Sequence, residues 1–529
     1  MVTSPAPIDR RVTFWHAAWS SYTPEILILL AYVAVRLVAL TDTLPVFIDE
    51  ATMIIRARDM LNGYTFEPMK FGKWLQVALV ALLRPKGPET LWAARGLTAL
   101  LATLSCAGAM ALGRLLDSRL TGRLAGALTV LAPLAVFSER QAMADPVLAA
   151  FLNLSLVLVV MLARTGRWRY ALASSVALVL GAISKLTGLF FLALPVVGAV
   201  LLARRRRVRV AMRGGLAAAL ALALIVGFIL YADSQVSPDR RLLTGGRGPS
   251  SLWCRHAGLC EGDAQPATTQ WKTSTKLDLY QGIMEYYVGL PTLALAALAG
   301  VVFLTDRRAR GAVVFLLVPG VGLGLLVVLV SNWYPVRYLN FTVSSLAVLA
   351  AITLSRLWRL GERLAGDAPL RRASAVAAIG VIVAVTLAGQ ASVDVPWLRA
   401  PYAVKLPPPD GQGCDGFGYG YDHVGETMRN WLEANGGRAN VVTKDPVLMQ
   451  AYWGTRVGAV KKWRNKDELR AEVASWVANG HAVFFADVSP SKEIPEAPFG
   501  ATLETVETFP LPCGEDVMRV RQLVQFDGE

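Results

Sequence analysis

Residues 47–56, Phe-Ile-Asp-Glu-Ala-Thr-Met-Ile-Ile-Arg, follow directly after the first long apolar segment of the chain. This position predicts that the stretch lies where a membrane ends and water begins. Apolar and polar residues recur with helical spacing over 48–62, which predicts a helix lying flat on the membrane surface. The apolar face would carry Ala51, Ile54, Ile55 and Leu61, and the polar face Asp49, Thr52, Arg56 and Asp59.

Two adjacent acids, Asp49 and Glu50, stand at this boundary. One interpretation is that they cap the helix and complement its positive N-terminal end. The other is that a carboxylate is held at the bilayer surface to act as a general base. The residue types alone do not separate these interpretations, so the rest of the chain has to decide.

The composition is that of a membrane protein. The chain has 529 residues, of which 54% are hydrophobic and 17% charged, and its mean hydropathy is +0.44. Repeated apolar runs of roughly 20 residues predict a polytopic α-helical membrane protein. The net charge of +14 could suggest a nucleic-acid partner. We expect none, because the arginines concentrate in short loops between apolar runs, as the positive-inside rule describes.

The apolar runs predict about eleven transmembrane helices within residues 1–391. A shorter apolar segment at 70–84 predicts a second surface or re-entrant helix. The predicted spans fall near 24–41, 91–113, 124–138, 146–163, 169–184, 186–203, 214–231, 283–304, 311–331, 338–355 and 373–391.

Arginine-rich loops alternate with loops of other composition along the whole membrane part. This alternation predicts a multi-pass plasma-membrane protein with its N-terminus in the cytoplasm. An odd number of spans then places residues 392–529 on the outer side. The arginine-rich loops lie near 114–123, 164–169, 204–213, 307–310 and 356–372.

The C-terminal part has a different pattern. Residues 392–410 are rich in proline and read as a linker. Strand and helix patterns then alternate through 411–529, which predicts an extracytoplasmic α/β domain with a small parallel or mixed sheet. We expect it to cover the outer face or to contact an acceptor. The predicted helices are 422–435, 446–453 and 465–478, and the predicted strands 439–443, 481–487, 502–508 and 517–524.

The five cysteines divide by position. Cys106 lies in an apolar run and is expected to be a packed thiol. Cys254 and Cys260 are close together in a long polar loop, and Cys414 and Cys513 lie near the two ends of the C-terminal region. Both pairs fit disulfides in an oxidising compartment, with unpaired surface thiols as the alternative. The predicted topology places all four outside the cytosol, which favours disulfides.

Ionisable residues near membrane depth are costly and therefore mark functional candidates. In this chain they gather on the predicted outer side. A carboxylate there can act as a general base toward a hydroxyl group, and nearby cations can hold a phosphate. Besides Asp49 and Glu50, the set comprises Lys70, Lys73, Glu139, Arg140, Asp145, Lys185, Arg337 and Tyr338.

Most of these residues also have a purely structural interpretation. The two lysines of 70–84 can extend from an interfacial helix to water, Asp145 can begin a helix, and Arg337 can anchor the chain at the interface. Lys185 is harder to explain in this way. It stands between two apolar runs with almost no loop, so its ammonium must lie near the interface or be paired.

Several segments resemble those of C-type (GT-C) glycosyltransferases, within the group of protein O-mannosyltransferases and aminoarabinose transferases. The similarity extends over about 24–391, and the segments occur in the family's order and on its side of the membrane. They are FIDEA at 47–51 followed by ARDMLNG at 57–63, ERQAMADP at 139–146, SKLTGLFFLALP at 184–195 and RYLNFTVSSLAVLAA at 337–351.

The resemblance implies a polyprenyl-phosphate sugar donor, inversion at the anomeric carbon and an active site at the outer leaflet. The acceptor would be a hydroxyl group on a protein, a glycan or a lipid. Asp49 would then be the catalytic base, and Glu50 would help to position the acceptor or the base.

The resemblance also implies a set of donor-phosphate contacts. These would come from Lys185, Arg337 and one of Lys70 and Lys73. The family often has a His/Lys-Pro-Pro-Leu segment after the first loop, whereas this chain has KFGKWL at 70–75. Because the prolines are missing, the sequence does not decide between the two lysines.

We expect no required metal. A divalent cation could bind the carboxylates of Asp49 and Glu50. However, the lysines and arginines already answer the phosphate charge, and the four histidines are scattered along the chain.

Two other functions fit a polytopic membrane protein. One is a transporter or lipid flippase for a phosphorylated or lipid-linked substrate. Transporters place charges near the bilayer midplane and are often built from repeated halves. In this chain the charges lie at one surface, and no second half resembles the first. The other is a membrane-anchored binding or scaffold protein in which the C-terminal domain does the work.

Overall fold

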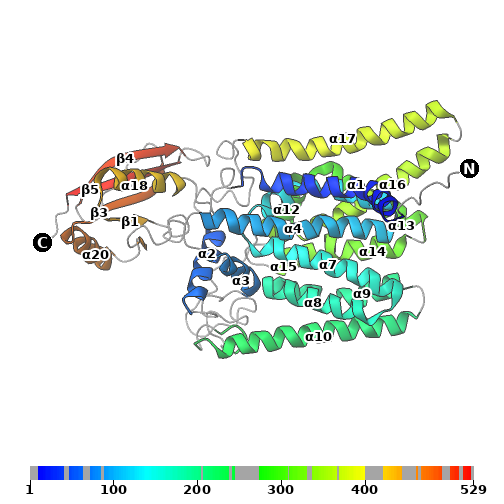
Figure 1. The fold of residues 1–529 in the computed structure, drawn as a ribbon, viewed down its shortest axis with the longest axis horizontal. Helices are drawn as coiled ribbons and strands as arrows, with labels where there is room; N and C mark the ends of the chain where they lie inside the picture. The colour runs from blue at the N-terminus through cyan, green and yellow to red at the C-terminus, as the bar shows by residue number, and fades with distance from the viewer. Residues whose placement is uncertain are drawn as a thin grey trace, which may run out of the picture.

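The computed structural model describes most of the chain, and Figure 1 shows its two parts. Long helices form a bundle, and a smaller part containing a β-sheet lies at one end of it. The N-terminus lies at the opposite end. The described residues are 10–40, 47–63, 72–84, 89–203, 206–237, 241–244, 273–307, 309–330, 336–365, 368–399, 421–443, 460–462, 466–490, 501–510 and 516–525.

The chain is a multi-pass membrane protein. Among the described residues, seven helical spans are long and apolar enough to cross a membrane, or eight if the bent pair α5 (Arg119–Val130) and α6 (Pro133–Glu139) counts as one. The seven are α4 (Glu89–Leu116), α7 (Ala144–Thr165), α10 (Arg207–Ser234), Lys276–Thr305, Arg310–Leu329, α16 (Thr342–Ala365) and the Pro369–Pro396 part of α17 (Pro369–Arg399).

Two of these spans are irregular. The first consists of α12 (Thr273–Ile283), the π-helical η4 (Met284–Gly289) and α13 (Leu290–Thr305). The second consists of α14 (Arg310–Leu317), the π-helical η5 (Val318–Gly322) and α15 (Leu323–Val330), and it precedes the short 3-10 helix η6 (Val336–Leu339).

Three further predicted crossings coincide with α1 (Arg10–Leu37), α8 (Trp168–Ser184) and the pair η2 (Leu186–Phe191) and α9 (Leu194–Leu202). They are not among the spans that meet the length and hydropathy criteria. Each predicted apolar run is therefore helical, while the total of eleven crossings stays a prediction.

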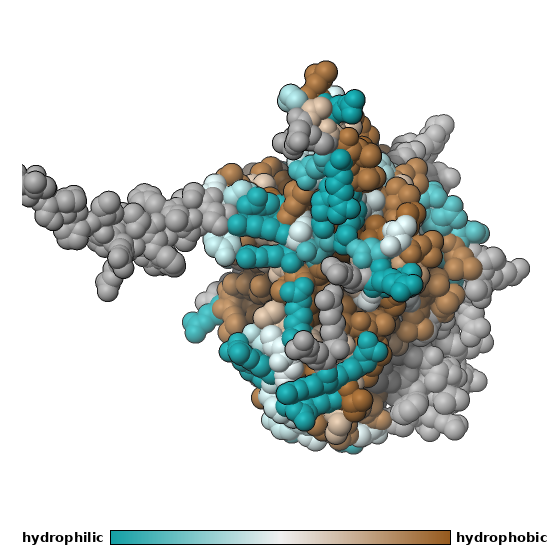
Figure 2. Space-filling model, turned by 90° about the vertical axis from the view of Figure 1, so that its right-hand side faces the viewer, coloured by the Kyte–Doolittle hydropathy of each residue, from teal (hydrophilic) through white to brown (hydrophobic). Residues whose placement is uncertain are grey.

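Charged residues mark the end of the bundle that faces away from the sheet. Figure 2 looks onto this end and shows hydrophilic side chains gathered among hydrophobic ones. Asp117, in the turn between α4 and α5, is ion-paired with Arg356 (2.9 Å) and Arg359 of α16. Arg356 also pairs with Asp306 at 2.7 Å. Some arginines expected only to orient the protein therefore also tie helix ends together.

Close backbone contact joins α4 to α5. A Cβ added at Gly122 would lie 2.5 Å from the carbonyl oxygen of Met110, and one at Gly113 would lie 2.8 Å from the Cα of Gly122. Small residues let helix backbones approach in this way inside membranes. The contact fixes the direction of α5, and so of α6 and the segment that follows it.

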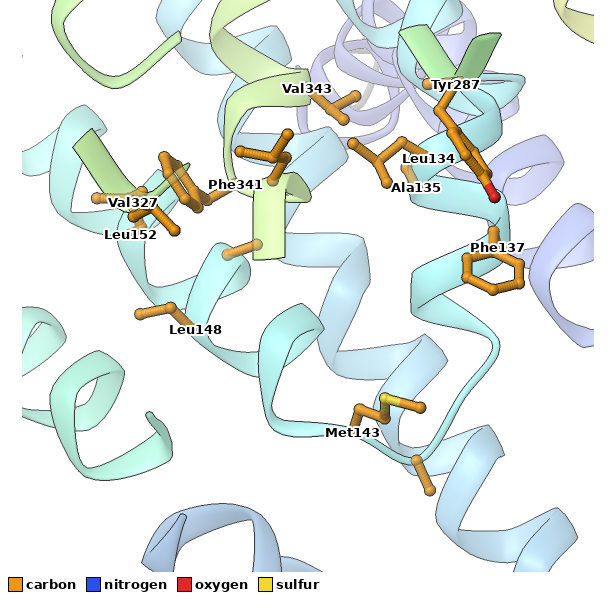
Figure 3. Packing of buried hydrophobic residues seen from close by; sticks show 14 of the residues in the cluster. Leu134, Ala135, Phe137, Met143, Leu148, Leu152, Tyr287, Val327, Phe341 and Val343 are labelled. Atoms are coloured by element: carbon orange, nitrogen blue, oxygen red, sulfur yellow. The ribbon is translucent and has the colours of Figure 1, made fainter. Parts of the chain in front are cut away.

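Apolar packing near the C-terminal end of α6 supports the segment that follows this helix (Figure 3). Phe137 of α6 packs near Tyr287 of η4, with ring centroids 6.0 Å apart. Phe341 packs edge-to-face against Phe191 of η2 at 4.9 Å. Both aromatic pairs lie in one buried cluster with residues of α7 such as Leu148. This packing joins segments that are distant in the sequence.

Two short helices lie at the end of the bundle near the sheet, α2 (Ile48–Leu61) and α3 (Trp74–Leu82) (Figure 1). They match the predicted segments 48–62 and 70–84. Ala51 and Ile54 of α2 are fully buried within the protein, whereas Leu61 is 52% exposed. The protein itself therefore covers part of the face that the sequence assigned to the membrane surface, because α2 packs against α3.

The C-terminal part contains a five-stranded mixed sheet with strand order β2-β1-β3-β5-β4. β1 is parallel to β2 and β3, and β5 is antiparallel to β3 and β4. The elements are α18 (Tyr421–Asn435), β1 (Ala439–Thr443), β2 (Val460–Lys462), α20 (Lys466–Ala478), β3 (Ala482–Pro490), β4 (Thr502–Pro510) and β5 (Asp516–Gln525).

The two helices of this part pack on opposite faces of the sheet. Trp431 of α18 packs edge-to-face on Phe484 of β3, with centroids 5.4 Å apart. The next residue, Phe485, lies in a separate buried cluster with Val473 and Trp476 of α20. Successive side chains of a strand point to opposite faces, so β3 is covered on both. The predicted helix at 446–453 lies outside the described residues.

The glycine contact between α4 and α5 can be tested by thermal unfolding. We expect Gly122→Ala to destabilise the protein by about 1–3 kcal/mol, because the new methyl group collides with the α4 backbone. Gly215→Ala is the matched control, since no atom lies within 4 Å of a Cβ at that position of α10. The control should be neutral or slightly stabilising. Equal effects of the two substitutions would contradict the proposed contact.

Candidate active site

The carboxylate of Asp49 lies at the start of α2 and is shared by two cations. The Nη2 atom of Arg337 donates to Oδ2 of Asp49, and the Nζ atom of Lys73 lies 3.4 Å from the same oxygen. The side chain of Asp49 is 31% exposed, whereas that of Arg337 is only 4% exposed. The carboxylate of Asp49 is therefore accessible to solvent, and its negative charge is balanced by Lys73 and Arg337.

A second carboxylate, that of Asp145 in the first turn of α7, completes the arrangement. The Nζ atom of Lys185 lies 2.5 Å from its Oδ1, and Nε of Arg337 lies 3.5 Å from its Oδ2. Arg337 thus bridges Asp49 and Asp145. We call these five residues, Asp49, Lys73, Asp145, Lys185 and Arg337, the charge cluster. With Lys185 protonated, three cations and two carboxylates leave it with one net positive charge.

Aromatic rings hold the cations of the cluster in place. The Nζ atom of Lys185 lies 3.3 Å from the centre of the Tyr338 ring. The guanidinium carbon of Arg337 lies 4.5 Å from the ring centre of Phe47 and 5.6 Å from that of Tyr338. Cations are attracted to the faces of aromatic rings at such distances. The predicted site residue Tyr338 therefore contacts both Lys185 and Arg337.

The backbone around the two lysines explains how they meet. Lys185 has an extended conformation (φ −160°, ψ 130°) between α8 and η2, so the helix is interrupted where its side chain enters the cluster. Gly72 has φ +64°, and a Cβ there would lie 2.5 Å from Cγ of Leu186. Glycine is favoured both by this left-handed conformation and by the close approach. The close approach of the backbone at Gly72 to Leu186 brings Lys73 beside Lys185.

Glu50, the neighbour of Asp49, is fully buried, and its side chain points toward Arg95 instead of the charge cluster. Its carboxylate receives hydrogen bonds from Nε and Nη2 of Arg95 at 2.9 and 2.8 Å. It also accepts from the backbone N–H groups of Phe47 (3.0 Å) and Ala142 (2.6 Å). Glu50 therefore ties α2 to α4 and to the segment that leads into Asp145. These contacts are structural, and the role of Glu50 beside Asp49 in positioning the acceptor or the base stays a prediction.

Arg140 was predicted as a donor-binding residue, but the structure does not bring it into the charge cluster. Its guanidinium donates to the carbonyl oxygens of Val35 (2.8 Å) and Ala39 (2.9 Å), at the end of α1. The last carbonyls of a helix lack intrahelical donors, so they attract such a group. The adjacent Glu139 is ion-paired with Arg36 of α1 at 3.0 Å. The ERQAMADP segment thus anchors α1 through its first residues.

Several predicted residues cannot be placed. Lys70 lies outside the described residues, so of the two candidate lysines the structure shows the contacts of Lys73 alone. Cys106 is a buried free thiol, as expected. The predicted disulfide cysteines, Cys254, Cys260, Cys414 and Cys513, also lie outside the described residues.

The cluster changes the acidity of its members. Burial alone would raise the pKa of Asp49, but the charges of Lys73, Arg337 and Lys185 outweigh it and hold this pKa well below its ordinary value. Burial, assisted by the charges of Arg337 and Lys73, lowers the pKa of Lys185 to about 7 against the opposing effect of Asp145. In this state Asp49 is ionised throughout the neutral range.

Three residues that support the site were not predicted from the sequence. Arg95 binds Glu50, Arg36 binds Glu139, and the ring of Phe47 packs against Arg337. The two arginines carried a usable signal, because each is a charge inside a predicted apolar span and must find a partner there. The sequence had no comparable signal for Phe47. Across the described ranges, no group of three or more His, Cys, Asp or Glu side chains could hold a metal ion.

Comparison with known proteins identifies the fold of the chain. The chain has the fold of the GT-C membrane glycosyltransferases. Residues 69–231 match the family model described as dolichyl-phosphate-mannose-protein mannosyltransferase. This matched region contains Lys73, Asp145 and Lys185 of the charge cluster. Among curated proteins, no sequence matches the chain.

Several solved structures are similar to this chain in fold. The structures of ArnT from Cupriavidus metallidurans, one in the apo state and one bound to undecaprenyl phosphate, superpose with TM-scores of 0.61 and 0.60. Each is 14% identical and covers 94% of this chain and 98% of ArnT. The apo oligosaccharyltransferase of Archaeoglobus fulgidus has a TM-score of 0.51 and 14% identity, over 90% of this chain and 70% of its own.

The buried pair of Glu50 and Arg95 predicts a large loss of stability when the Glu50 carboxylate is removed. Glu50→Ala leaves the buried charge of Arg95 unpaired, which costs about 3–5 kcal/mol. Removing both charges with Glu50→Leu and Arg95→Met should restore much of the loss in thermal unfolding. Glu25→Ala is the control, because the pairs of Glu25 with Arg119 and Arg123 are partly exposed and should contribute about 0–1 kcal/mol. A loss no greater than that of the control would contradict this prediction.

Proposed function

We propose that this chain is an inverting glycosyltransferase that moves a sugar from a polyprenyl-phosphate donor to a hydroxyl acceptor at the outer face of the plasma membrane. The observation that carries the proposal is the charge cluster. It combines one accessible carboxylate, Asp49, with the three cations Lys73, Lys185 and Arg337. Those are the groups needed to deprotonate a hydroxyl and to hold a phosphate.

The donor phosphate would bind to Lys73, Lys185 and Arg337. A sugar phosphodiester has one negative charge, which balances the single net positive charge of the cluster. Cations placed around the phosphate also stabilise the charge that develops on it as the sugar leaves. The ArnT structure with bound undecaprenyl phosphate supports this choice of donor, because it shows a lipid phosphate bound by the same fold.

The resemblance to GT-C enzymes implies inversion, and the unequal accessibility of the two carboxylates supports it. A single displacement requires one base that deprotonates the acceptor hydroxyl as it attacks the anomeric carbon from the side opposite the phosphate. Asp49 is 31% exposed and can reach an acceptor, whereas Asp145 is 6% exposed and bound to Lys185. Asp145 is thus poorly placed to form a covalent glycosyl intermediate, which a retaining double displacement would require.

The distribution of charge supports the proposed orientation. The arginine-rich loops belong to the end of the bundle opposite α2, α3 and the sheet (Figures 1 and 2). By the positive-inside rule that end faces the cytoplasm, so the charge cluster lies at the outer leaflet. The C-terminal sheet is at the same end as α2. It is available to cover the site or to contact a protein, glycan or lipid acceptor.

The central test is a transfer assay with purified protein and polyprenyl-phosphate sugars. We expect Asp49→Asn to reduce turnover by about 10²–10⁴-fold, the usual contribution of a general base. Asp59→Asn, on the same helix but outside the cluster, should retain turnover near that of the wild type. Near-normal transfer by Asp49→Asn would remove Asp49 from the mechanism. Movement of the lipid-linked sugar across vesicles without transfer would favour the transporter alternative.

We also propose that the reaction needs no divalent metal, because Lys73, Lys185 and Arg337 supply the charge that a metal would otherwise provide. Treatment with EDTA, followed by the same assay in metal-free buffer, should leave turnover unchanged. Loss of activity that Mg²⁺ or Mn²⁺ restores would show that a metal takes part, with the accessible carboxylate of Asp49 as its first candidate ligand.

A further inference from the structure

Asp49 is bound by the same cations that the donor phosphate requires. Both Arg337 and Lys73 contact its Oδ2 atom. A carboxylate stabilised in this way is a weak base, because its pKa lies well below the ordinary value. The cluster as it stands therefore opposes the role of Asp49 in the proposed reaction, and something must weaken these contacts before transfer.

The charge balance of the reaction indicates that the donor phosphate weakens these contacts. A bound phosphodiester brings one negative charge and competes with Asp49 for Arg337 and Lys73. In the transfer, a bond forms between the acceptor oxygen and the anomeric carbon. The bond from that carbon to the phosphate oxygen breaks, and its electron pair stays on the phosphate. The phosphate gains a second negative charge, and the acceptor's proton goes to Asp49, so the complex stays neutral as a whole.

Building on the proposed function, we propose that a bound polyprenyl phosphate and Asp49 share one proton. The lipid phosphate draws Arg337 and Lys73 away from Asp49, which restores the basicity of its carboxylate. The proton taken from the acceptor then stays on the Asp49–phosphate pair until the lipid phosphate leaves. In such a coupled pair the proton belongs to both groups rather than to one. Release of polyprenyl phosphate is therefore linked to loss of a proton.

Among the described groups around Asp49, Lys185 is the other candidate for a proton near neutral pH. Lys73 precedes α3, Arg337 and Tyr338 belong to η6, and Asp145 and Lys185 lie behind Arg337. Glu50, on the same helix, is turned toward Arg95. Arginine stays protonated. Lys185, with a pKa of about 7, could also take up a proton when a phosphate binds, so the experiment has to separate it from Asp49.

The test is isothermal titration of the full-length protein in lipid nanodiscs with farnesyl phosphate, a short polyprenyl phosphate. Paired buffers of different ionisation enthalpy report the protons taken up. Above the second pKa of a phosphomonoester, about 6, the wild type should take up about one proton per ligand. Its Kd should rise by up to tenfold per pH unit. Asp49→Asn should take up none, and its Kd should stay nearly constant between pH 7 and 8.5.

Two further variants separate the alternatives. Lys185→Arg keeps the positive charge but does not titrate, so proton uptake should persist in it. Asp59→Asn should behave as the wild type does. Binding by the wild type without proton uptake, or uptake that persists in Asp49→Asn, would overturn this inference and leave the proposed function intact. Absence of saturable binding to the wild type would contradict the proposed donor class, and this inference with it.

Discussion

The bridge that Arg337 makes between Asp49 and Asp145 is the interaction on which the site depends. The side chain of Arg337 is only 4% exposed, and both carboxylates lie within reach of its N–H groups. A buried charge without partners costs several kcal/mol, so each member of the cluster stabilises the others. The need to pair these charges holds α2, α7 and η6 close together, although they are far apart in the sequence. The packing of α6, η4 and η2 then supports the segments that carry them.

The two adjacent acids show how one dipeptide can serve two purposes. The side chains of Asp49 and Glu50 leave the first turn of α2 in different directions. Glu50 is enclosed and takes hydrogen bonds from Arg95 and two backbone N–H groups. Asp49 remains accessible, and among the described residues its carboxylate is bound by the cations Lys73 and Arg337. The enclosed acid fixes where the accessible one stands, and through Ala142 it also fixes the start of α7. The buried acid therefore has a structural role, and under the proposed function the chemistry falls to its accessible neighbour.

Much of this architecture could be predicted from the sequence because it depends on local pattern. Apolar runs predicted where helices occur, and the strands at 439–443 and 517–524 followed from short apolar runs between turn residues. Lys73, Asp145 and Lys185 were candidates because a charge beside an apolar run needs a partner. The identity of each partner depends on packing between distant segments. No local pattern therefore indicates that Arg140 binds the end of α1, or that Arg95 rather than a cation of the cluster binds Glu50.

The decisive measurement is a structure of this protein with a polyprenyl phosphate bound. We expect the phosphate to contact Arg337, Lys73 and Lys185, and the contact between Arg337 and Asp49 to lengthen or to be lost. We also expect Asp49 to stay accessible to an acceptor on the side away from the lipid. A phosphate bound elsewhere, with Arg337 still joined to Asp49 and Asp145, would contradict the claim that this cluster is the donor site.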